Sequence, residues 1–435
     1  MQKDKDASVS YGTGPATDGQ QLTDNVHASC RFCGTPLYQT VVDLGMSPLC
    51  ESYLRQDQLN EMEAFYPLHV YVCDNCFLVQ LEEYVSPKKI FTEYAYFSSY
   101  SASWLEHARS YSRMATERFG IDDTSLVVEL ASNDGYLLQY FAKAGIRVLG
   151  VEPALNVADA ALKKGIPTLT RFFGVELAKE MASLGQQADL LIGNNVLAQV
   201  PDLHDFVKGM QIVLTPKGAI TMEFPYLMEL IKKNQFDTIY HEHFSYFSFT
   251  TVEKIFAAHN LKLFDVEKIP THGGSLRIYA CHAEDGSKQV NSRVEALRAH
   301  EEKAGVKTLG YYISFSEKVR ETKRKLLEFL ISTKEQGKSI AGYGAPGKGN
   351  TLLNYCGVRS DFLDYTVDRS PYKQNKFLPG THIPIFDPAK IDETKPDYLL
   401  ILPWNFRDEV IKQMAHIRSW GGKFVVPIPE VRVYP

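Results

Sequence analysis

Strand-like and helix-like segments alternate through the middle of the chain, and this pattern constrains the fold more than any other. Apolar runs typical of buried strands are SLVVEL (125–130), IRVLGV (146–151), ADLLIG (188–193) and GAITMEF (218–224). Helical patterns lie between them, as in GYLLQYFAKAG, ALNVADAALKKG and DLHDFVKGMQIVL. The alternation predicts an α/β fold with a parallel, doubly wound sheet, to which LKLFDVEKI and GSLRIYACHA add later antiparallel strands.

A second series of strand-like runs follows nearer the C-terminus. It consists of SIAGYG (339–344), FLDYTVD (362–368), DYLLILP (397–403) and GKFVVPIP (422–429). The stretch 286–336 between the two series is charged and helical, and we interpret it as a connector packed along one face. The sequence therefore predicts two α/β domains joined by helices.

Four cysteines near the N-terminus form two pairs, CRFC (Cys30, Cys33) and CDNC (Cys73, Cys76), with 39 residues between the pairs. Each pair places two thiolates on a tight turn, and four thiolates suit tetrahedral Zn²⁺. Two disulfides are the alternative, which a reducing compartment disfavours. Because four thiolates leave no open position on the metal, we expect a structural zinc in a domain of turns and short strands.

The composition limits the classes of partner. Of the 435 residues, 44% are apolar and 23% are charged, and the formal net charge of −5 argues against a dedicated nucleic-acid binder. No apolar run approaches the roughly 20 residues that span a bilayer. The polar start, residues 1–27, lacks the apolar core of a signal peptide and predicts a disordered tail. We expect a cytoplasmic protein that binds neither nucleic acid nor membrane.

The loop after the first predicted strand indicates a nucleotide-like ligand. In VVELASNDGYLLQYF an acid ends the strand, and Glu152 ends the next strand 23 residues after Glu129. Ligands of such sheets sit at the carboxyl ends of strands, where an acid can accept hydrogen bonds from ribose hydroxyls. A loop with one glycine fits S-adenosylmethionine (SAM) better than a dinucleotide. The expected cofactor-binding residues are Glu129, Ala131, Asn133, Asp134, Gly135, Glu152, Pro153, Asn194 and Asn195. For the two asparagines, capping of the following turn remains the alternative.

The C-terminal series contains a glycine-rich loop, AGYGAPGKGNTLLN, between a strand and a helix. Glycines let backbone N–H groups face an anion, and the helix N-terminus and Lys348 add positive charge. The spacing is not that of an ATPase loop, so we expect the diphosphate of another ligand, with a structural turn as the alternative. The following VDRSPYKQNKFLPGTHIPI would close over that ligand. The residues expected to bind substrate here are Tyr343, Gly344, Lys348, Asn350, Asp368 and Lys373.

The run TIYHEHFSYFS (238–248) contains two histidines, a glutamate and two tyrosines within a few residues of one another. Taken alone it is compatible with a metal box, a packed aromatic strand or an acid–base centre. In an extended run Tyr240 and Glu242 would share one face and His241 and His243 the other, whereas in a turn all four could converge. Histidine titrates near neutrality and therefore suits the role of a general base.

These motifs together resemble the SAM-dependent C-methyltransferases of nucleotide-activated deoxysugars, of which the TDP-4-keto-sugar C-3′-methyltransferases are the best-known members. The resemblance runs from Cys30 to about Pro429 through CRFCG, CDNC, YFSSYS, VVELASNDGYLL, GVEP, YHEHFSYFS, HGGSLR, GYGAPGKGNTLLNYCG and PGTHIPI. It implies a zinc-binding domain (28–90), a SAM-dependent methyltransferase domain (91–285), a helical connector (286–336) and a C-terminal Rossmann-like sugar-nucleotide domain (337–435). The catalytic residues that it implies are His243, Glu242 and Tyr240, with Tyr94 or Tyr96, and His241 and His272 are expected to contact substrate.

The expected reaction is methylation of C3 of a TDP-linked 4-keto-deoxysugar by an enzyme that we take to be monomeric. His243 would remove the proton beside the ketone, and Tyr240 and Glu242 would position the sugar and stabilise charge. The chain departs from the resemblance at Gln199, where a histidine is expected near the active site. Three alternatives remain: methylation of C5, a zinc-ribbon methyltransferase of RNA or protein, and a sugar-nucleotide binder that has lost activity.

Overall fold

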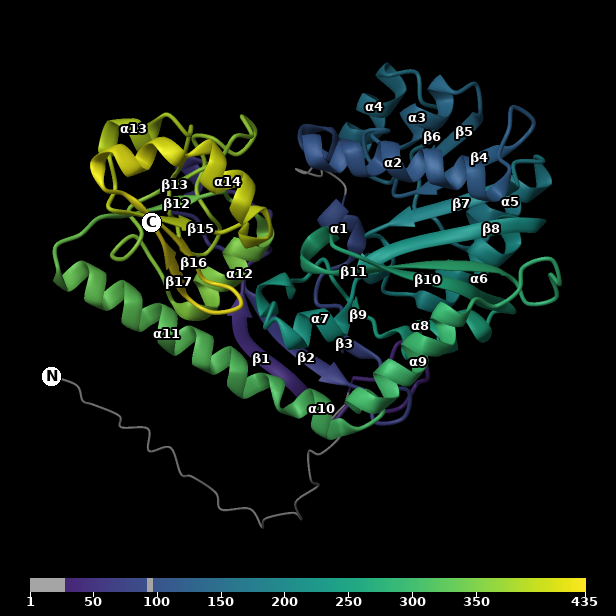
Figure 1. The fold of residues 1–435 in the computed structure, drawn as a ribbon, viewed down its shortest axis with the longest axis horizontal. Helices are drawn as coiled ribbons and strands as arrows, with labels where there is room; N and C mark the ends of the chain where they lie inside the picture. Colours follow the sequence, from purple (N-terminus) through teal and green to yellow (C-terminus); the bar gives the residue numbers. More distant parts are fainter. Residues whose placement is uncertain (1–27, 92–96) are drawn as a thin grey trace, which may run out of the picture.

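The computed structural model describes residues 28–91 and 97–435, and the predicted N-terminal tail lies outside them. The chain builds three β-sheets, which lie side by side in Figure 1: the central sheet on the right, the C-terminal sheet on the left, and strands β1 and β2 below and between them. The predicted mixed α/β architecture with a separate cysteine-rich part is confirmed.

The first sheet is small, antiparallel and built partly from a distant segment. Its strands, in the order β1-β2-β3-β9, are β1 (Gln39–Ser47), β2 (Tyr66–Val72), β3 (Val79–Leu81) and β9 (Ser245–Tyr246). Short helices accompany it: η1 (Gln56–Gln58), α1 (Pro87–Phe91) and η2 (Ser98–Tyr100). Strand β9 belongs to the TIYHEHFSYFS run, so this run completes the sheet of the cysteine-rich part.

The central sheet has seven strands in the order β10-β11-β8-β7-β4-β5-β6. Its bounds are β4 (Leu126–Leu130), β5 (Arg147–Val151), β6 (Thr168–Leu169), β7 (Ala188–Asn194), β8 (Leu214–Pro225), β10 (Leu261–Ile269) and β11 (Ser275–His282). Strands β4 to β8 pair in parallel, and β10 and β11 are antiparallel, as predicted. The two-residue strand β6 is too short to give a signal in the sequence.

Alternate residues along the central strands point to opposite faces of the sheet, and each face packs against a different set of helices. Val127, Leu190 and Ile192 pack beneath α2 (Ala102–Phe119), α3 (Leu138–Lys143) and α4 (Leu155–Lys163). Val128 and Leu191 face the opposite layer, α5 (Val175–Ser183), α6 (Leu203–Val213) and α8 (Phe249–Ala257). Both faces are therefore buried, as a doubly wound sheet requires. The short helices η3 (Leu197–Gln199), α7 (Leu227–Lys232), η4 (Phe236–Thr238) and η5 (Thr271–Gly273) follow strand ends or loops.

Three helices lead to the C-terminal sheet: α9 (Ser292–Ala304), α10 (Leu309–Ile313) and the long α11 (Phe315–Glu335), which runs beneath that sheet in Figure 1. The sheet order is β14-β13-β12-β15-β16-β17, parallel except for β17. Its elements are β12 (Ile340–Tyr343), α12 (Gly347–Cys356), β13 (Thr366–Val367), β14 (Ile385–Phe386), α13 (Lys390–Thr394), β15 (Tyr398–Ile401), η6 (Trp404–Phe406), α14 (Arg407–Gln413), η7 (Ala415–Trp420), β16 (Lys423–Val426) and β17 (Arg432–Tyr434). The edge strands β14 and β17 are short and were not predicted.

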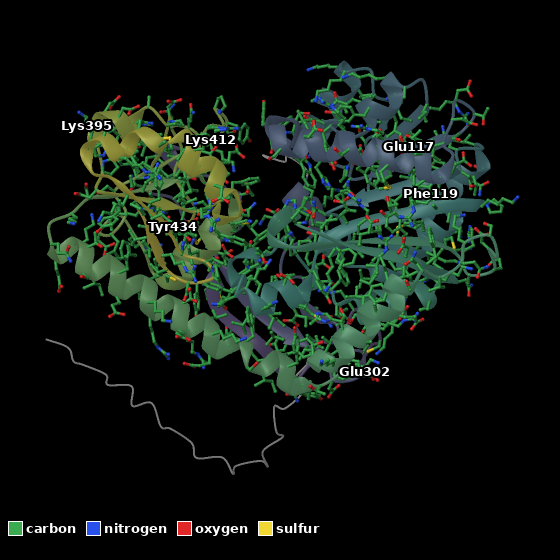
Figure 2. All side chains as sticks on the ribbon, viewed as in Figure 1. Glu117, Phe119, Glu302, Lys395, Lys412 and Tyr434 are labelled. Carbon is green, nitrogen blue, oxygen red and sulfur yellow. The ribbon has the colours of Figure 1, made fainter. Side chains whose placement is uncertain are left out.

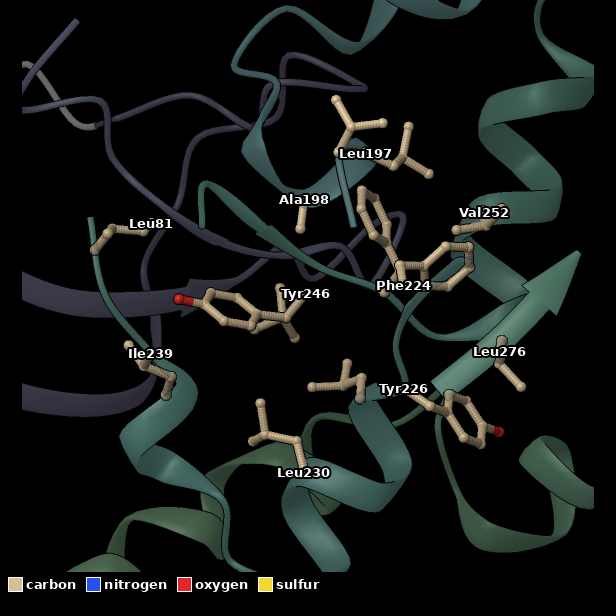
Figure 3. Close-up of a cluster of buried hydrophobic side chains, with 14 of the residues drawn as sticks. Leu81, Leu197, Ala198, Phe224, Tyr226, Leu230, Ile239, Tyr246, Val252 and Leu276 are labelled. Atoms are coloured by element: carbon tan, nitrogen blue, oxygen red, sulfur yellow. The ribbon is translucent and has the colours of Figure 1, made fainter. Parts of the chain in front are cut away.

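One apolar cluster continues from the first sheet into the central sheet. Figure 3 shows part of it, with Leu81 from β3, Tyr246 from β9 and Phe224 from β8. Burial of such side chains contributes about 25 cal/mol per Å² of apolar area, so the sheets are held together by a shared core. Charged side chains such as Glu117, Lys395 and Lys412 lie on the outside (Figure 2). None of the helices within residues 28–91 and 97–435 combines the length and the apolar character needed to cross a bilayer.

Candidate active site and zinc centre

The four paired cysteines converge on one point. The ligand atoms of Cys30, Cys33, Cys73 and Cys76 all lie within 4.8 Å of one another. Tight turns orient them: the N–H of Gly34 donates to Cys30 O at 2.9 Å and that of Phe77 to Cys73 O at 3.0 Å, and Gly34 and Phe77 adopt positive φ. Four sulfur donors at this spacing fit a tetrahedral Zn²⁺ that has no open position. Such an ion would hold the two turns together and would have a structural role, because four thiolates leave no position for another ligand.

The predicted donor loop lies at the carboxyl end of β4. Ala131 (φ 54°) and Asn133 (φ 50°) adopt the left-handed region, which non-glycine residues enter rarely. The N–H of Asn133 donates to Glu152 Oε2 at 3.0 Å, and the N–H of Ala154 donates to Oε1 at 2.8 Å. Strain of this kind clusters at functional sites, where surrounding contacts over-determine the backbone. Glu152 thus holds the loop in shape while its carboxylate keeps lone pairs for ribose hydroxyls.

Several of the expected donor ligands line a cavity of about 460 Å³, a size typical of small-molecule sites. They are Ala131, Asn133, Glu152, Pro153, Asn194 and Asn195. Glu129, Asp134 and Gly135 are buried behind this wall. Asp134 is paired there with Lys164 at 2.9 Å, and burial raises the pKa of Glu129. These three residues therefore support the loop from behind, and the direct contact with the cofactor that the sequence predicted for them stays a prediction.

The Tyr-His-Glu-His run forms a turn, in which the N–H of His243 donates to Tyr240 O at 2.9 Å. Tyr240, Glu242 and His243 all line the cavity. The rings of Tyr240 and His243 lie 4.1 Å apart between centroids. Tyr94 and Tyr96 fall within 92–96, outside the described residues.

The imidazole of His241 does not line the cavity, unlike the other three side chains of the Tyr-His-Glu-His run, and its contact with substrate stays a prediction. Its Nε2 lies 3.1 Å from the carbonyl of Pro67, and its ring makes an edge contact with Tyr66. The turn directs this one side chain toward β2, so that His241 connects the cysteine-rich part to the run 238–248. The metal-box interpretation of the run likewise has no support, because His241 and His243 point to different partners.

His243 has a defined tautomer. Its Nδ1 lies 3.0 Å from the carbonyl oxygen of Thr238, which can only accept, so Nδ1 carries the proton and Nε2 the lone pair. Burial lowers the pKa of His243 to about 4. The hydrogen bond to Thr238 opposes this shift, and the positive charge of Lys348 adds to it. The imidazole is therefore neutral at pH 7 and has a free lone pair, as a general base requires.

His272 lines the same cavity, in the left-handed region at φ 53°. It contacts Trp104 edge-on at 5.1 Å, and burial lowers its pKa to about 3. Gly273 beside it cannot be replaced without collision, because a Cβ there would lie 2.6 Å from both the Gln235 amide and the ring of Trp404. The HGG turn is thus fitted against the C-terminal part.

Of the six residues expected to bind substrate in the C-terminal part, Lys348 and Lys373 line the cavity. The other four, Tyr343, Gly344, Asn350 and Asp368, do not. The Tyr343 hydroxyl donates to Gln413 at 2.9 Å, and the Asn350 amide donates to Cys50 O at 2.5 Å. Asp368 accepts from the N–H of Ala345 at 2.8 Å. These four residues shape the glycine-rich loop, and the direct contact with substrate that the sequence predicted for them stays a prediction.

The cavity also has walls that sequence reasoning missed. Trp104 stacks on Tyr136 at 5.9 Å and on His107 at 4.9 Å, and Glu51 reaches in from the cysteine-rich part. Phe172, Phe173 and Phe206 add aromatic surface near the donor loop. The helical spacing around Trp104 gave no sign of this role. Gln199, the departure noted in the sequence, lines the cavity as well.

A second hollow of about 520 Å³ lies at the opposite edge of the central sheet, beside the starts of β4 and β7. Two of its three cations, Arg118 and Lys288, are already paired with Asp265 and Asp285, and the third is Lys217. Ligands of α/β sheets bind at the carboxyl ends of strands, so the 460 Å³ cavity is the candidate active site. Its ribose acceptor and aromatic walls fit SAM, whose adenosine offers two hydroxyls and a flat ring.

Known proteins resemble the chain over almost its whole length. Family models match in three parts: a zinc binding domain at residues 30–91, a methyltransferase domain at 104–266 and a C-methyltransferase C-terminal domain at 270–429. The C-methyltransferase NovU of Streptomyces niveus is 38% identical over 404 residues, which cover 93% of this chain and 96% of NovU.

Two solved structures show more distant likenesses. Magnesium protoporphyrin IX methyltransferase of Synechocystis PCC 6803 with bound S-adenosylhomocysteine is 14% identical, with a TM-score of 0.34 over 41% of this chain and 83% of that chain. A SAM-dependent methyltransferase of Clostridium acetobutylicum is 11% identical, with a TM-score of 0.34 over 41% and 92%. With its zinc-binding, methyltransferase and C-terminal domains matched in order, the chain belongs to the family of SAM-dependent C-methyltransferases.

Proposed function

We propose that the protein methylates a carbon beside the ketone of a nucleotide-activated 4-keto-deoxysugar, at C3 of a TDP-hexose. The observation that carries the proposal is one shared cavity, which is lined by residues of the central sheet and of segments next to the other two sheets. A neutral histidine with a free lone pair lies in the same cavity as the donor loop and as two lysines of the C-terminal part. A carbon acid, a methyl donor and negative charge on the substrate would each meet a matching wall.

The base is His243. A carbon beside a ketone loses its proton when a base removes it while the ketone oxygen is stabilised, and Nε2 of His243 has the lone pair for this step. A positioned general base of this kind contributes typically about 10²–10⁴-fold to the rate. Because the imidazole is neutral well below pH 7, the base is ready across the physiological range.

Tyr240 and Glu242 flank the base. Burial, together with the neighbouring Cys50 and Glu242, raises the pKa of Tyr240, so its hydroxyl stays protonated and can donate to an oxyanion or to a sugar hydroxyl. Glu242 is held against the cysteine-rich part, where the thiol of Cys50 donates to Oε1 at 3.7 Å. We assign these two residues to positioning the sugar.

Glu152, Asn133 and Asn195 form the wall that would hold SAM, with the aromatic side chains near Phe173 beside the adenine. When bound, SAM supplies an electrophilic methyl group to the carbon that has lost its proton. The protein's own contribution is to exclude water and to keep the donor and the sugar on opposite sides of one cavity.

The test is incubation of the purified protein with methyl-labelled SAM and a TDP-4-keto-6-deoxyhexose, followed by NMR of the product. We expect label on C3 of the sugar. Label on C5 would correct the position while keeping the reaction. Absence of label from the sugar skeleton, with transfer to RNA or protein instead, would overturn the proposal.

A further inference from the structure

Lys348 has different contacts from those that its glycine-rich loop suggests. It lies in the first turn of α12 and lines the cavity together with Tyr240, His243 and His272. The sequence predicts a diphosphate ligand here, because a helix N-terminus and a lysine attract an anion. Two sets of contacts point to another role.

The first concerns the end of α12, which already holds a carboxylate. The N–H of Gly347 donates to Glu51 Oε1 at 3.1 Å. The other oxygen of Glu51 accepts from the Tyr53 hydroxyl at 2.9 Å and lies 3.6 Å from Lys373 Nζ. A phosphate at this helix end would meet a negative charge at close range, so the local electrostatics disfavour it.

The second concerns how the ammonium of Lys348 is held. Its Nζ donates to Asn405 Oδ1 at 2.9 Å and lies 4.8 Å from the ring centroid of Trp404. Trp404 is itself fixed, since its Nε1 donates to Asp237 Oδ2 at 2.6 Å. Among the described residues Asn405 is the one hydrogen-bond acceptor of Lys348. An ammonium has three donors, so further donors remain for a ligand in the cavity.

The charge of Lys348 reaches the catalytic histidines. Burial lowers the pKa values of His243 and His272, and in both the positive charge of Lys348 contributes in the same direction. The charge of Lys348 therefore acts on both histidines within the cavity that all three residues line. A cation there suits negative charge that develops during proton removal.

We propose that Lys348 is a catalytic residue that stabilises the enolate oxygen of the substrate, an inference that rests on the proposed function. The C–H bond beside the ketone breaks, its proton passes to Nε2 of His243, and its electron pair moves through the new C=C bond onto the ketone oxygen. Lys348 offers a charged hydrogen bond to that oxygen. Tyr240 adds a neutral donor.

The test separates enolate formation from methyl transfer. The 4-keto sugar nucleotide is incubated in D₂O with enzyme and S-adenosylhomocysteine, and NMR follows deuterium entering the carbon beside the ketone. For Lys348→Met we expect the exchange rate and kcat to fall together by about 100-fold, the range seen when one oxyanion donor is removed. The Kd for TDP should change less than about 3-fold, and Lys348→Arg should restore part of the exchange.

Lys412→Met is the matched control, because Lys412 is an exposed lysine of the same part of the chain (Figure 2). Thermal melting checks that each variant is folded. If Lys348→Met is not folded, Lys348→Gln takes its place in the experiment. Exchange at the wild-type rate in a folded, neutral variant would overturn the inference. A large loss of TDP affinity at unchanged kcat would also overturn the inference, because it would show that Lys348 binds the phosphate. A wild-type enzyme that neither exchanges nor methylates the sugar would overturn the proposed function itself.

Discussion

Tyr246 pairs with Val79 across an antiparallel ladder, 167 residues apart in the chain. Next to this pair, the N–H of Leu81 donates to Phe244 O at 3.0 Å. The run TIYHEHFSYFS therefore supplies the fourth strand of the sheet in the cysteine-rich part, β9. Because β3 follows the second cysteine pair directly, order at the metal site and order at the catalytic turn are coupled.

Removal of zinc should therefore disturb catalysis as well as stability. We expect Cys73→Ser, or treatment with a strong chelator, to release about one zinc per chain and to lower Tm by roughly 10 °C or more, because a structural zinc contributes directly to folding. Activity should fall in parallel. Metal analysis and calorimetry measure both effects. Cys281→Ser is the control, since this buried cysteine lies outside the cluster and its variant should keep the zinc.

Glu301 should be the most sensitive acid of the connecting helices. Its buried carboxylate accepts from the N–H groups of Phe249 and Thr250 at 2.7 and 2.8 Å and from the Tyr226 hydroxyl at 2.8 Å. Glu301→Gln places an amide donor against these donors, and we expect a loss of about 2–4 kcal/mol of unfolding free energy. The exposed neighbour Glu302 (Figure 2) is the control, and Glu302→Gln should change stability by less than about 0.5 kcal/mol in urea unfolding.

Substitutions of His241 and His243 should have clearly different effects on kcat. His243→Gln removes the base, and we expect kcat to fall by about 10²–10⁴-fold at a nearly unchanged Kd for the donor. His241→Gln removes a contact with Pro67, so we expect a lower Tm but a kcat within about 3-fold of the wild type. Steady-state kinetics of both variants tests this prediction. A larger loss of kcat in His241→Gln than in His243→Gln would contradict the assignment of His243 as the base.

The pH profile should report the low pKa of His243. Its neutral form is the active one, so kcat/KM for the sugar nucleotide at saturating donor falls only as the imidazole is protonated. With a pKa of about 4, against an ordinary value of 6.5, the profile should be flat from pH 8 to about 6 and should fall below about pH 5. In the unfolded chain His243 takes up its proton near pH 6.5, whereas in the native protein it does so only near pH 4. The stability of the protein should therefore decrease as pH falls from about 6.5 to about 4. An acid limb centred near pH 6.5 would show that His243 is not buried in this way.

Donor affinity should depend on Glu152. Burial raises the pKa of Glu152 to about 7, against the opposing hydrogen bonds from Ala154 and Asn133. The carboxyl is therefore increasingly neutral below pH 7, and a neutral carboxyl is a weaker acceptor for ribose hydroxyls. We expect the Kd for S-adenosylhomocysteine to rise as pH falls from 8 to 6, and Glu152→Gln to raise Kd by about 10-fold or more and to remove this pH dependence. Asp159→Asn, at an exposed position of α4, is the calorimetric control.

Features set by local spacing could be predicted well from the sequence. Two C-x-x-C pairs place four thiolates on two turns in any fold that brings the turns together, and the acids Glu129 and Glu152 follow directly from the ends of apolar runs. The strands of the central sheet were predicted for the same reason, because burial on both faces leaves long apolar runs. The two-residue strands β6, β9, β13 and β14 carry too few residues for any such pattern, and of these only β13 fell within a predicted run.

Contacts between distant segments could not be predicted. Nothing in the run TIYHEHFSYFS says that His241 turns toward Pro67 while His243 turns toward Thr238, since this depends on which sheet β9 joins. Nothing near Lys348 says that Glu51, almost 300 residues earlier, will cap its helix.

The sequence by itself therefore determined the α/β class, the four-cysteine cluster and the kind of chemistry that the catalytic run can perform, because these follow from residue type and short-range spacing. The tertiary structure decided which side chains share one cavity and which nitrogen of His243 keeps its lone pair. It also decided which groups surround Lys348, namely Asn405 and the ring of Trp404. The physical reason is that burial, hydrogen-bond partners and electrostatic fields come from residues that only folding brings together.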